Sequence, residues 1–228
     1  MNPYEVKEVA TCVVLGAGAG VGQAVARAFL GRGYHVALCA RNREKLDALS
    51  AELGENASAW HLDVSNLDEL KVCLAEIAEK HGDIEVLHFN AFSLTPGRGS
   101  RIDPEKFSYS LAVNVTPALT ASQAVIPAMK GLGKGTILFT GGGYAIQPAA
   151  NVTALSVGKA ALRALNQCLH EELTSSGIHV ATVTICGIVA PGTAFDPSVI
   201  AESFLQLHDQ PAGAFDAEIV FNPVAVPV

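Results

Sequence analysis

The sequence has few features of a disulfide-stabilised, membrane-spanning or metal-binding protein. Its five cysteines are far apart and show no CxxC spacing, which predicts reduced thiols in a cytoplasmic protein. No apolar run reaches the roughly 18–20 residues that a membrane span needs, and the first residues do not resemble a signal peptide. The seven histidines form no HExxH pattern. We therefore expect no membrane partner and no metal site.

Basic charge is also scarce. The 15 Lys and Arg residues are scattered and outnumbered by 22 Asp and Glu residues, which gives a net charge of −7. Because nucleic-acid binders usually present a basic face, we expect no nucleic-acid partner. Half of the 228 residues are apolar and no Pro/Ser-rich linker divides them, so we expect one domain over residues 1–228.

Short apolar segments alternate with segments of helical period along most of the chain. The expected strands are 10–15, 34–40, 57–62, 84–90, 135–140 and 178–185, with a further apolar segment at 219–221. Repeated βα units predict parallel strands joined by right-handed crossovers. We therefore expect an α/β fold with a doubly wound parallel sheet of the Rossmann type, in three layers, with its ligand site beyond the carboxyl ends of the strands.

Several residues predict where the helices begin and end. Asn42 and Ser65 are expected N-caps, and Pro104 is expected to open a long helix to about residue 129. Pro117 lies inside that helix and predicts a kink there. A second long helix is expected at 152–175, closed by Gly177, and a short helix after residue 196.

The most informative motif follows the first strand. Gly16, Gly18, Gly20, Val21 and Gly22 lie in a turn that opens the first helix. Glycines allow a tight turn and a close approach of the backbone to a pyrophosphate, which the free N–H groups of the helix N-terminus bind. The alternative is a tight turn without a ligand. The position between a first strand and a first helix favours dinucleotide binding.

The end of the second strand indicates which dinucleotide binds. An acidic residue about 20 positions after the glycines usually binds the ribose hydroxyls of NAD. This sequence has Arg41 there instead, with Arg43 nearby. A guanidinium can pair with the 2′-phosphate of NADP, so we expect NADP, with NAD as the alternative. Both arginines can also be ordinary surface residues.

Together with four further segments, the glycine turn resembles the short-chain dehydrogenase/reductase family. The four segments are residues 61–64, 89–92, 111–115 and 185–189, and the resemblance spans about residues 9 to 221. Leu15 and Cys186 stand where that family usually has Thr and Pro. The resemblance implies an adenine contact from Asp63 and Val64 and a loop beside the nicotinamide at 187–189. The cofactor-binding residues that it implies, besides the glycine turn and Arg41, are Asp63, Val64, Asn90, Lys159, Gly187 and Val189.

The catalytic residues of that family match only in part. Asn114 matches the helical asparagine of its tetrad, and Lys159 matches the lysine of its Tyr-xxx-Lys motif. Leu155 stands at the tyrosine position. The serine position, 13 residues earlier, is Gly142. In the family the tyrosine donates the proton and the serine holds the substrate oxygen, so the resemblance implies a reaction pocket without either hydroxyl.

Other groups can be weighed as replacements. Tyr144 lies two residues after Gly142 and is the candidate acid, or else a loop aromatic that packs on substrate or cofactor. Asn114 is either a relay residue or a structural one. Tyr109 and Ser156 are expected to point elsewhere, from their angular positions on their helices.

Two functions follow. The first is an NADP-dependent oxidoreductase of a small carbonyl or alcohol substrate with a non-standard proton donor, using residues 190–208 as a lid. The second is a catalytically inactive NADP-binding sensor or partner subunit. The resemblance also implies a homodimer or homotetramer formed through the helices 104–129 and 152–175.

Overall fold

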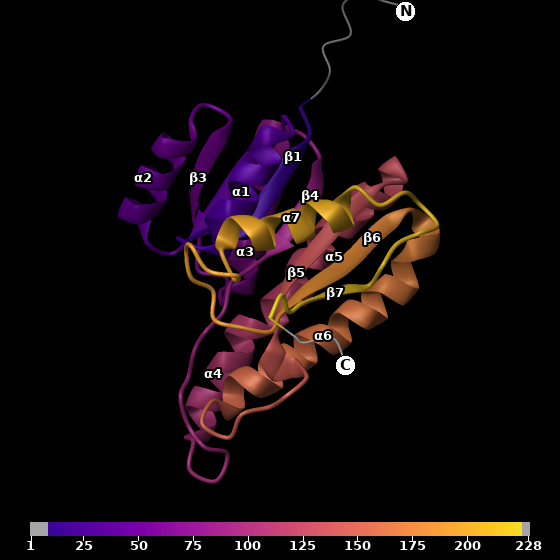
Figure 1. The fold of residues 1–228 in the computed structure, drawn as a ribbon. Helices are drawn as coiled ribbons and strands as arrows, with labels where there is room; N and C mark the ends of the chain where they lie inside the picture. The colour runs from indigo at the N-terminus through magenta and orange to yellow at the C-terminus, as the bar shows by residue number, and fades with distance from the viewer. Residues whose placement is uncertain (1–8, 225–228) are drawn as a thin grey trace, which may run out of the picture.

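The computed structural model describes residues 9–224 and contains one seven-stranded sheet in the order β3-β2-β1-β4-β5-β6-β7 (Figure 1). Its strands are β1 (Thr11–Leu15), β2 (His35–Ala40), β3 (Ala57–His61), β4 (Ile84–Phe89), β5 (Gly135–Gly142), β6 (Ile178–Ile185) and β7 (Glu218–Phe221). Every neighbouring pair is parallel. The strand order reverses direction between β1 and β4, which is where open α/β sheets bind their ligands.

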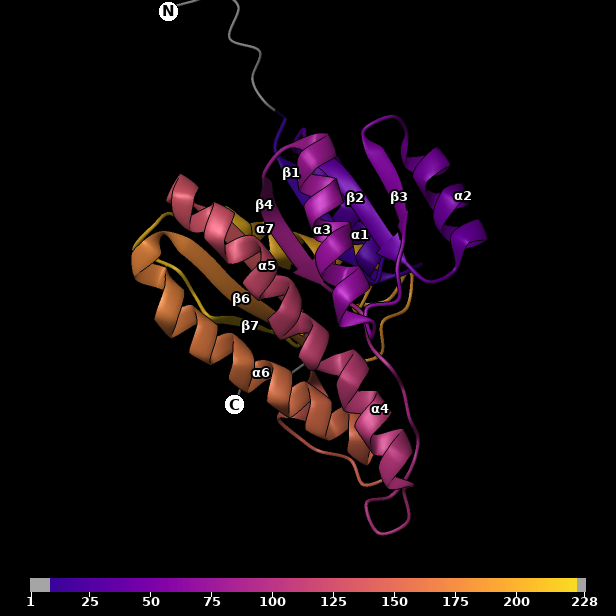
Figure 2. The same ribbon diagram turned by 180° about the vertical axis from the view of Figure 1, so that it is seen from behind.

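Helices cover both faces of the sheet (Figures 1 and 2). They are α1 (Val21–Gly31), α2 (Arg43–Leu53), α3 (Leu67–His81), α4 (Pro104–Asn114), α5 (Thr116–Leu132), α6 (Thr153–Leu173) and α7 (Pro197–His208), with short 3₁₀ turns η1 (Gly143–Ala145) and η2 (Thr174–Ser176). Helices α1, α2 and α7 contribute to the core on one face. Helices α3, α5 and α6 contribute to the core on the other. The expected doubly wound Rossmann-type fold is therefore confirmed.

Alternation along the strands divides the buried residues between the two cores. In β1, Val13 and Leu15 face the core under α3 and α5, whereas Cys12 and Val14 face the core under α1 and α7. This is the two-residue period of a strand whose both faces are covered. Because both faces are buried, the sheet is a rigid support, and the loops at its carboxyl edge carry the exposed polar groups.

The expected single helix from 104 to about 129 is wrong. The chain forms α4 and then α5, separated at Val115, whose φ of −129° and ψ of −59° lie outside the helical region. Pro117 lies in the first turn of α5, where a missing N–H costs nothing because that group has no partner within the helix. The proline inside a helix is Pro127, in α5.

Two smaller expectations also change. Asn42 caps α2 through a 2.9 Å bond from the Lys45 N–H, as predicted, but α3 is capped by Asn66 rather than Ser65. From Pro197 onward, the expected lid is helix α7, whose Ile200 and Phe204 are fully buried against α1. The lid expectation for 190–208 stays a prediction, with the start of α7 lining the cavity and the rest of that helix packed on the core.

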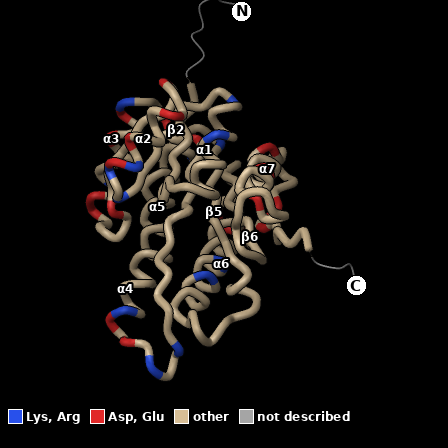
Figure 3. The backbone as a smooth tube through the Cα atoms, turned by 60° about the vertical axis from the view of Figure 1, so that its left-hand side comes forward, with Lys and Arg blue, Asp and Glu red and all other residues tan. Residues whose placement is uncertain are grey.

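The surface of the described chain has mixed charge. Figure 3 shows Lys and Arg interspersed with Asp and Glu on the outer helices and loops. None of the helices within residues 9–224 is long and apolar enough to cross a membrane. All five cysteines are free thiols, as the sequence predicts.

Candidate functional site

A cavity of about 1260 Å³ opens at the carboxyl ends of β4, β5 and β6. Its lining comes from the start of α1, the chain after β4, η1, α6, the chain after β6 and the start of α7. Six of the residues that the sequence assigns to a cofactor line it: Gly20, Val21, Asn90, Lys159, Gly187 and Val189. The predicted edge of the sheet is therefore hollow.

The glycine turn is held by backbone bonds to the neighbouring strands. The N–H groups of Gly16 and Ala17 both donate to the Cys39 carbonyl of β2, at 2.9 and 3.0 Å. Gly16 has a φ of +88°, and a Cβ there would lie 2.5 Å from the backbone nitrogen of Ala91. A Cβ on Gly22 would lie 2.7 Å from the Gly16 carbonyl oxygen. The close approach of the turn to the chain after β4 thus requires glycine at Gly16, and the close crossing of α1 over the turn requires it at Gly22.

The start of α1 can accept an anion. Its N-cap is Gly20, and no side chain in residues 9–224 caps its first turn. A Cβ on Gly18 or Gly20 would meet no atom within 4 Å, so open space lies in front of this helix end. Free N–H groups and the positive end of the helix dipole suit a diphosphate, and these residues therefore fit a dinucleotide.

A chain of hydrogen bonds joins the glycine turn to the end of β5. The Asn90 amide donates from Nδ2 to the Gly16 carbonyl, and its Oδ1 accepts from the Thr140 hydroxyl, both at 2.9 Å. His88 Nε2 lies 2.9 Å from the same hydroxyl oxygen. Because that hydroxyl has already given its one proton to Asn90, His88 must donate. Burial, with the charge of Lys159 second, lowers the pKa of His88 to about 3, so the imidazole is neutral.

Lys159 lies on α6 with its ammonium at the wall of the cavity. Its Nζ donates to the Thr140 carbonyl oxygen at 2.6 Å and lies 5.9 Å from the centroid of the Phe92 ring. Burial lowers the pKa of Lys159 to about 8. One of the three ammonium donors is used in this bond, which leaves donors for a ligand.

Positions 142 and 155, where the sequence predicts that two hydroxyls are missing, line the same cavity. Leu155 lines the cavity one turn before Lys159 and is 7% exposed. Gly142 lines it from β5, and a Cβ there would lie 3.6 Å from the Lys159 side-chain carbons, an ordinary contact. Tyr144 lines the cavity from η1 and is 43% exposed. The structure thus brings together Lys159, Tyr144 and the two altered positions.

Asn114 does not line the cavity, and its side chain makes structural hydrogen bonds instead. Its Oδ1 accepts from the Ser93 N–H at 2.6 Å, and its Nδ2 donates to the Ser93 carbonyl and the Ser110 hydroxyl. A Cβ on Gly158 would lie 3.1 Å from Asn114 Cβ, so α4 and α6 approach closely here. The amide therefore fixes the chain after β4 to α4, on which α6 packs closely.

The residues expected to bind the adenosine half lie beyond the cavity. Arg41 is exposed, with Nη1 3.5 Å from the Tyr109 hydroxyl. Asp63 accepts from the Ser65 N–H and hydroxyl, at 3.0 and 2.7 Å. Burial raises the pKa of Asp63, but these bonds and the charge of Arg41 outweigh it and bring it below the ordinary value. A guanidinium thus stands beside a carboxylate at this edge, with Val64 buried behind it.

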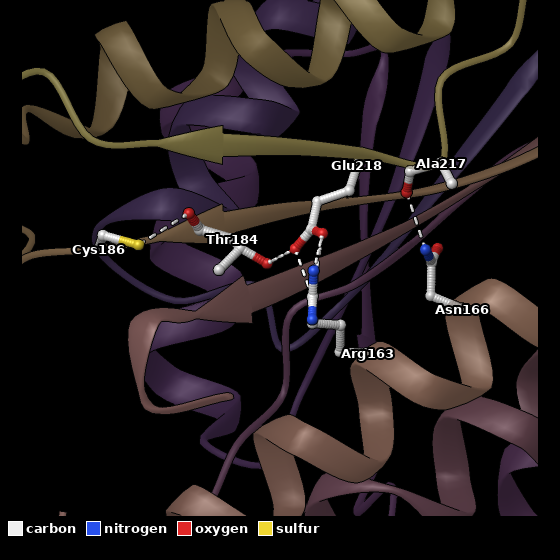
Figure 4. Close-up of polar contacts among 6 residues, drawn as sticks. All are labelled: Arg163, Asn166, Thr184, Cys186, Ala217 and Glu218. Atoms are coloured by element: carbon white, nitrogen blue, oxygen red, sulfur yellow. Dashed lines mark hydrogen bonds and ion pairs between the residues drawn. The ribbon is translucent and has the colours of Figure 1, made fainter. Parts of the chain in front are cut away.

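A polar cluster ties β7 to β6 and α6 beside the cavity (Figure 4). The Arg163 Nε and Nη2 atoms donate to the Glu218 carboxylate at 2.6–3.0 Å. Thr184 donates to the same carboxylate at 2.5 Å. Asn166 donates to the Ala217 carbonyl at 2.8 Å, and the Cys186 thiol to the Thr184 carbonyl at 3.8 Å. Three elements that bound the cavity are thereby locked together.

The sequence predictions missed several cavity residues because tertiary packing places them there. Cys186 was noted only as a departure from the family pattern and Phe92 only as the end of the segment 89–92, although both line the cavity. The cavity also contacts Arg27 of α1 and Asp196 at the start of α7, which the sequence alone does not bring together. The position of Phe92 three residues after the end of β4 was a signal that could have identified it.

Comparisons with known proteins agree with this geometry. Residues 10–199 match the family model described as short chain dehydrogenase. The chain is 31% identical over 183 residues to 2,3-dihydro-2,3-dihydroxybenzoate dehydrogenase of Bacillus subtilis (strain 168), covering 79% of this chain and 68% of the relative. It is 26% identical over 222 residues to an uncharacterized oxidoreductase of Staphylococcus aureus (strain MW2), covering 93% and 96%.

Solved structures show the same architecture. A metagenomic short-chain oxidoreductase in complex with NADP matches with a TM-score of 0.85 and 28% identity, covering 92% of this chain and 96% of that one. A short-chain dehydrogenase from Rhodopseudomonas palustris matches with a TM-score of 0.83 and 30% identity, at the same coverages. Each match extends over nearly the whole described chain.

Proposed function

The chain belongs to the short-chain dehydrogenase family, and on that premise we propose that it is an NADP-dependent oxidoreductase with a non-standard proton donor. Its substrate in this proposal is a small carbonyl compound or the corresponding alcohol. The observation that supports the proposal is the continuity between the glycine turn and the cavity. One chain of hydrogen bonds, through Asn90 and Thr140, links the diphosphate-binding backbone to the ammonium of Lys159.

In this proposal, residues at both ends of the hydrogen-bond series would bind the cofactor. The first turn of α1 would bind the diphosphate, and Arg41 would pair with the 2′-phosphate beside Asp63. Gly187 and Val189 would lie against the nicotinamide, and Lys159 would reach its ribose. When bound, the cofactor supplies the hydride. NAD is the alternative, because Arg41 is the single guanidinium that this preference depends on.

The substrate end of the cavity is mainly apolar. Leu155, Ile146, Ile188 and Val220 are among the apolar residues that line the cavity, and we place the substrate against them. Apolar walls with a small number of polar groups are typical of sites for small organic substrates. A carbonyl oxygen directed toward Gly142 would lie near the Lys159 ammonium, which attracts the negative charge that forms on it during reduction.

The second candidate function is an inactive NADP-binding sensor or partner subunit. Leu155 favours it, because a leucine can neither give nor accept a proton. General acid catalysis is worth roughly 10²–10⁴ in rate, so a site that merely lost its donor would be a poor enzyme. In this alternative the cavity binds the dinucleotide and turns over nothing.

Two measurements test the proposed function. Calorimetric titration should show NADPH binding at least tenfold more tightly than NADH, and Arg41→Ala should remove that difference. Equal affinities would defeat the NADP assignment. The full chain with saturating NADPH is then assayed with aldehydes, α-diketones, quinones and activated alkenes. Turnover supports the oxidoreductase, whereas tight binding with no turnover supports the sensor.

Assembly and location are part of the same proposal. We expect a homodimer or homotetramer through α4, α5 and α6, whose small residues Ala160, Ala161 and Ala164 permit close packing. Light scattering checks this, and a monomer at micromolar concentration would contradict it. A cytoplasmic location remains our expectation, and fractionation of the native cell tests it.

A further inference from the structure

Lys159 is a partly buried cation without an anionic partner in the described chain. Its ammonium donates to the neutral carbonyl of Thr140, and the ion pairs within residues 9–224 involve other side chains. A lysine that is drawn into a protein usually has a carboxylate beside it, because burial disfavours the charge. The arrangement is therefore costly for a purely structural residue.

The carboxylate on this side of α6 is already satisfied. Glu218 accepts three bonds from Arg163, which lies one helical turn after Lys159, and another from Thr184 (Figure 4). Its charge is thus balanced by Arg163. The Glu218 carboxylate therefore stabilises the neighbouring cation and leaves the Lys159 ammonium without a counterion.

The other elements around Lys159 form no ion pair with it within residues 9–224. β5 presents Thr140 and Gly142, and β4 presents the neutral His88 behind Thr140. The titratable groups that line the cavity from η1 and from the chain after β6 are Tyr144, Cys186 and Asp196, and Arg27 lines it from α1. Burial raises the pKa of the Cys186 thiol, so it is uncharged. The Asp196 carboxylate accepts from the N–H groups of Gly192 and Ser198 and from the Ser198 hydroxyl at the start of α7. An incoming ligand can consequently meet an unneutralised ammonium.

The side chains beside Lys159 leave it access to a substrate. Where the serine and tyrosine of the family would stand, Gly142 has no side chain and Leu155 has no polar group. Nζ uses one donor on Thr140 and reaches the cavity wall. Tyr144, the rival hydroxyl, lies in η1 and is 43% exposed. Lys159 is therefore the buried proton-bearing group at the cavity wall next to both altered positions.

We propose that the Lys159 ammonium is itself the proton donor to the substrate oxygen, in place of a tyrosine. This rests on the proposed function. The carbonyl carbon accepts the hydride that the nicotinamide cofactor supplies, and the carbonyl π bond breaks with its electron pair moving to oxygen. That oxygen takes a proton as an N–H bond of Nζ breaks. The products are an alcohol, the oxidised cofactor and a neutral Lys159 amine, which regains a proton from water.

The acidity of Lys159 suits this step. A donor works best when its pKa is near the working pH, and burial lowers the pKa of Lys159 to about 8. Because the protonated form is the reactive one, reduction is fastest below pH 8 and is lost as the pH rises through that value. A tyrosine donor with its ordinary pKa near 10 would stay protonated about two pH units further.

The first experiment uses the aldehydes and α-diketones of the assay panel with saturating NADPH. Lys159→Arg keeps a cation but holds its proton across the pH range. We expect it to bind NADPH and to lower kcat by roughly 10²-fold or more. Lys159→Ala should be equally slow and should be rescued by added methylamine in a concentration-dependent way. Lys71→Met, at an exposed lysine of α3, is the matched control and should behave as the unmodified chain.

Rescue by methylamine supports the donor role, because a lost structural contact does not respond to an amine in solution. The proposal is overturned if Lys159→Arg keeps its kcat, or if Tyr144→Phe abolishes the high-pH loss of activity. NADPH binding without turnover of any carbonyl also overturns it and favours the sensor. If NADPH itself fails to bind, the proposed function fails first.

A second measurement needs no turnover. The chain without cofactor is labelled with acetic anhydride over a range of pH, and each lysine is quantified by mass spectrometry. Lys159 should reach half of its maximal reactivity near pH 8, below the ordinary value for a lysine of about 10, and the exposed Lys71 is quantified in the same samples for comparison. A Lys159 midpoint at or above that of Lys71 contradicts the proposal.

Discussion

Arg163 of α6 donates hydrogen bonds to Glu218 of β7 from two nitrogen atoms. The Nε and Nη2 atoms lie 2.6–3.0 Å from the carboxylate oxygens, and the Glu218 side chain is only 10% exposed. Hydrogen bonds between a planar guanidinium and a carboxylate are directional as well as charged. β7 is an edge strand of four residues, and this side-chain contact adds to its ladder with β6.

Replacing Arg163 by leucine should destabilise the fold. The Glu218 carboxylate would keep its bond from Thr184 but lose its counterion, and leaving such a group unpaired costs about 1–3 kcal/mol. Urea unfolding followed by circular dichroism measures the loss. Arg32→Leu is the matched control, because its partner Asp209 is 44% exposed and exposed pairs are worth about 0–1 kcal/mol. Equal effects of the two substitutions would show that Glu218 is not held as described.

Two glycines of the cofactor turn should respond differently to alanine. A Cβ on Gly22 would lie 2.7 Å from the Gly16 carbonyl oxygen, so Gly22→Ala should lower the free energy of unfolding by about 1–3 kcal/mol. A Cβ on Gly18 would meet nothing within 4 Å, so Gly18→Ala should fold normally. It should still weaken NADPH binding, because the methyl group would project where we propose the diphosphate. Unchanged NADPH affinity of a folded Gly18→Ala protein would move the diphosphate elsewhere.

A stacked imidazole pair makes the fold sensitive to acid. His35 and His81 lie with ring centroids 3.7 Å apart. Burial, then the charges of His81 and Lys80, lower the pKa of His35 to about 4, and burial lowers that of His81. The unfolded chain takes up these protons below about pH 6.5 and the folded chain does not, so stability is complete above 6.5 and falls toward pH 4.

The matched measurement compares urea midpoints between pH 7.5 and 4.5 for the unmodified chain and His35→Gln. We expect the variant to lose less stability on acidification, although the buried His88 keeps part of the dependence in both. Parallel curves for the two proteins would mean that the pair is already charged or solvated in the folded state.

Local patterns were enough to predict the sheet but not every helix boundary. The segment 178–185 is β6 with the predicted ends, because it is rich in the β-branched residues Ile, Val and Thr, which favour strands. The kink expected at Pro117 was wrong, because a proline is compatible both with the interior of a kinked helix and with the first turn of a new one. The conformation of Val115 decides between them, and the sequence does not encode it locally.

The candidate site, too, could be predicted from the sequence only in part. The glycine turn was predictable because its spacing reflects backbone requirements that Gly16 and Gly22 meet directly. The lack of a counterion at Lys159 was not predictable. It depends on the ion pair between Arg163 and Glu218, and Glu218 lies on a strand 55 residues further along the chain. Helical spacing placed Lys159 and Leu155 on one face, but only the tertiary structure identifies which carboxylates remain free.

Restoring the family's hydroxyls should raise activity. Gly142 accepts a serine Cβ, since the nearest atoms would be 3.6 Å away, and Leu155 borders a cavity with room for a phenol. In the double substitution Gly142→Ser with Leu155→Tyr, the new phenol would lie one turn from Lys159, whose positive charge favours the phenolate and lowers the pKa of that tyrosine. We expect kcat for aldehydes to increase by roughly 10-fold to 10²-fold, toward the range that general acid catalysis contributes.

The assay is NADPH oxidation by stopped flow, with Leu155→Phe as the control of similar size. An increase in the phenylalanine variant as well would assign the gain to shape, and a double variant that binds NADPH without any gain would show that the cavity does not place a carbonyl beside residue 155.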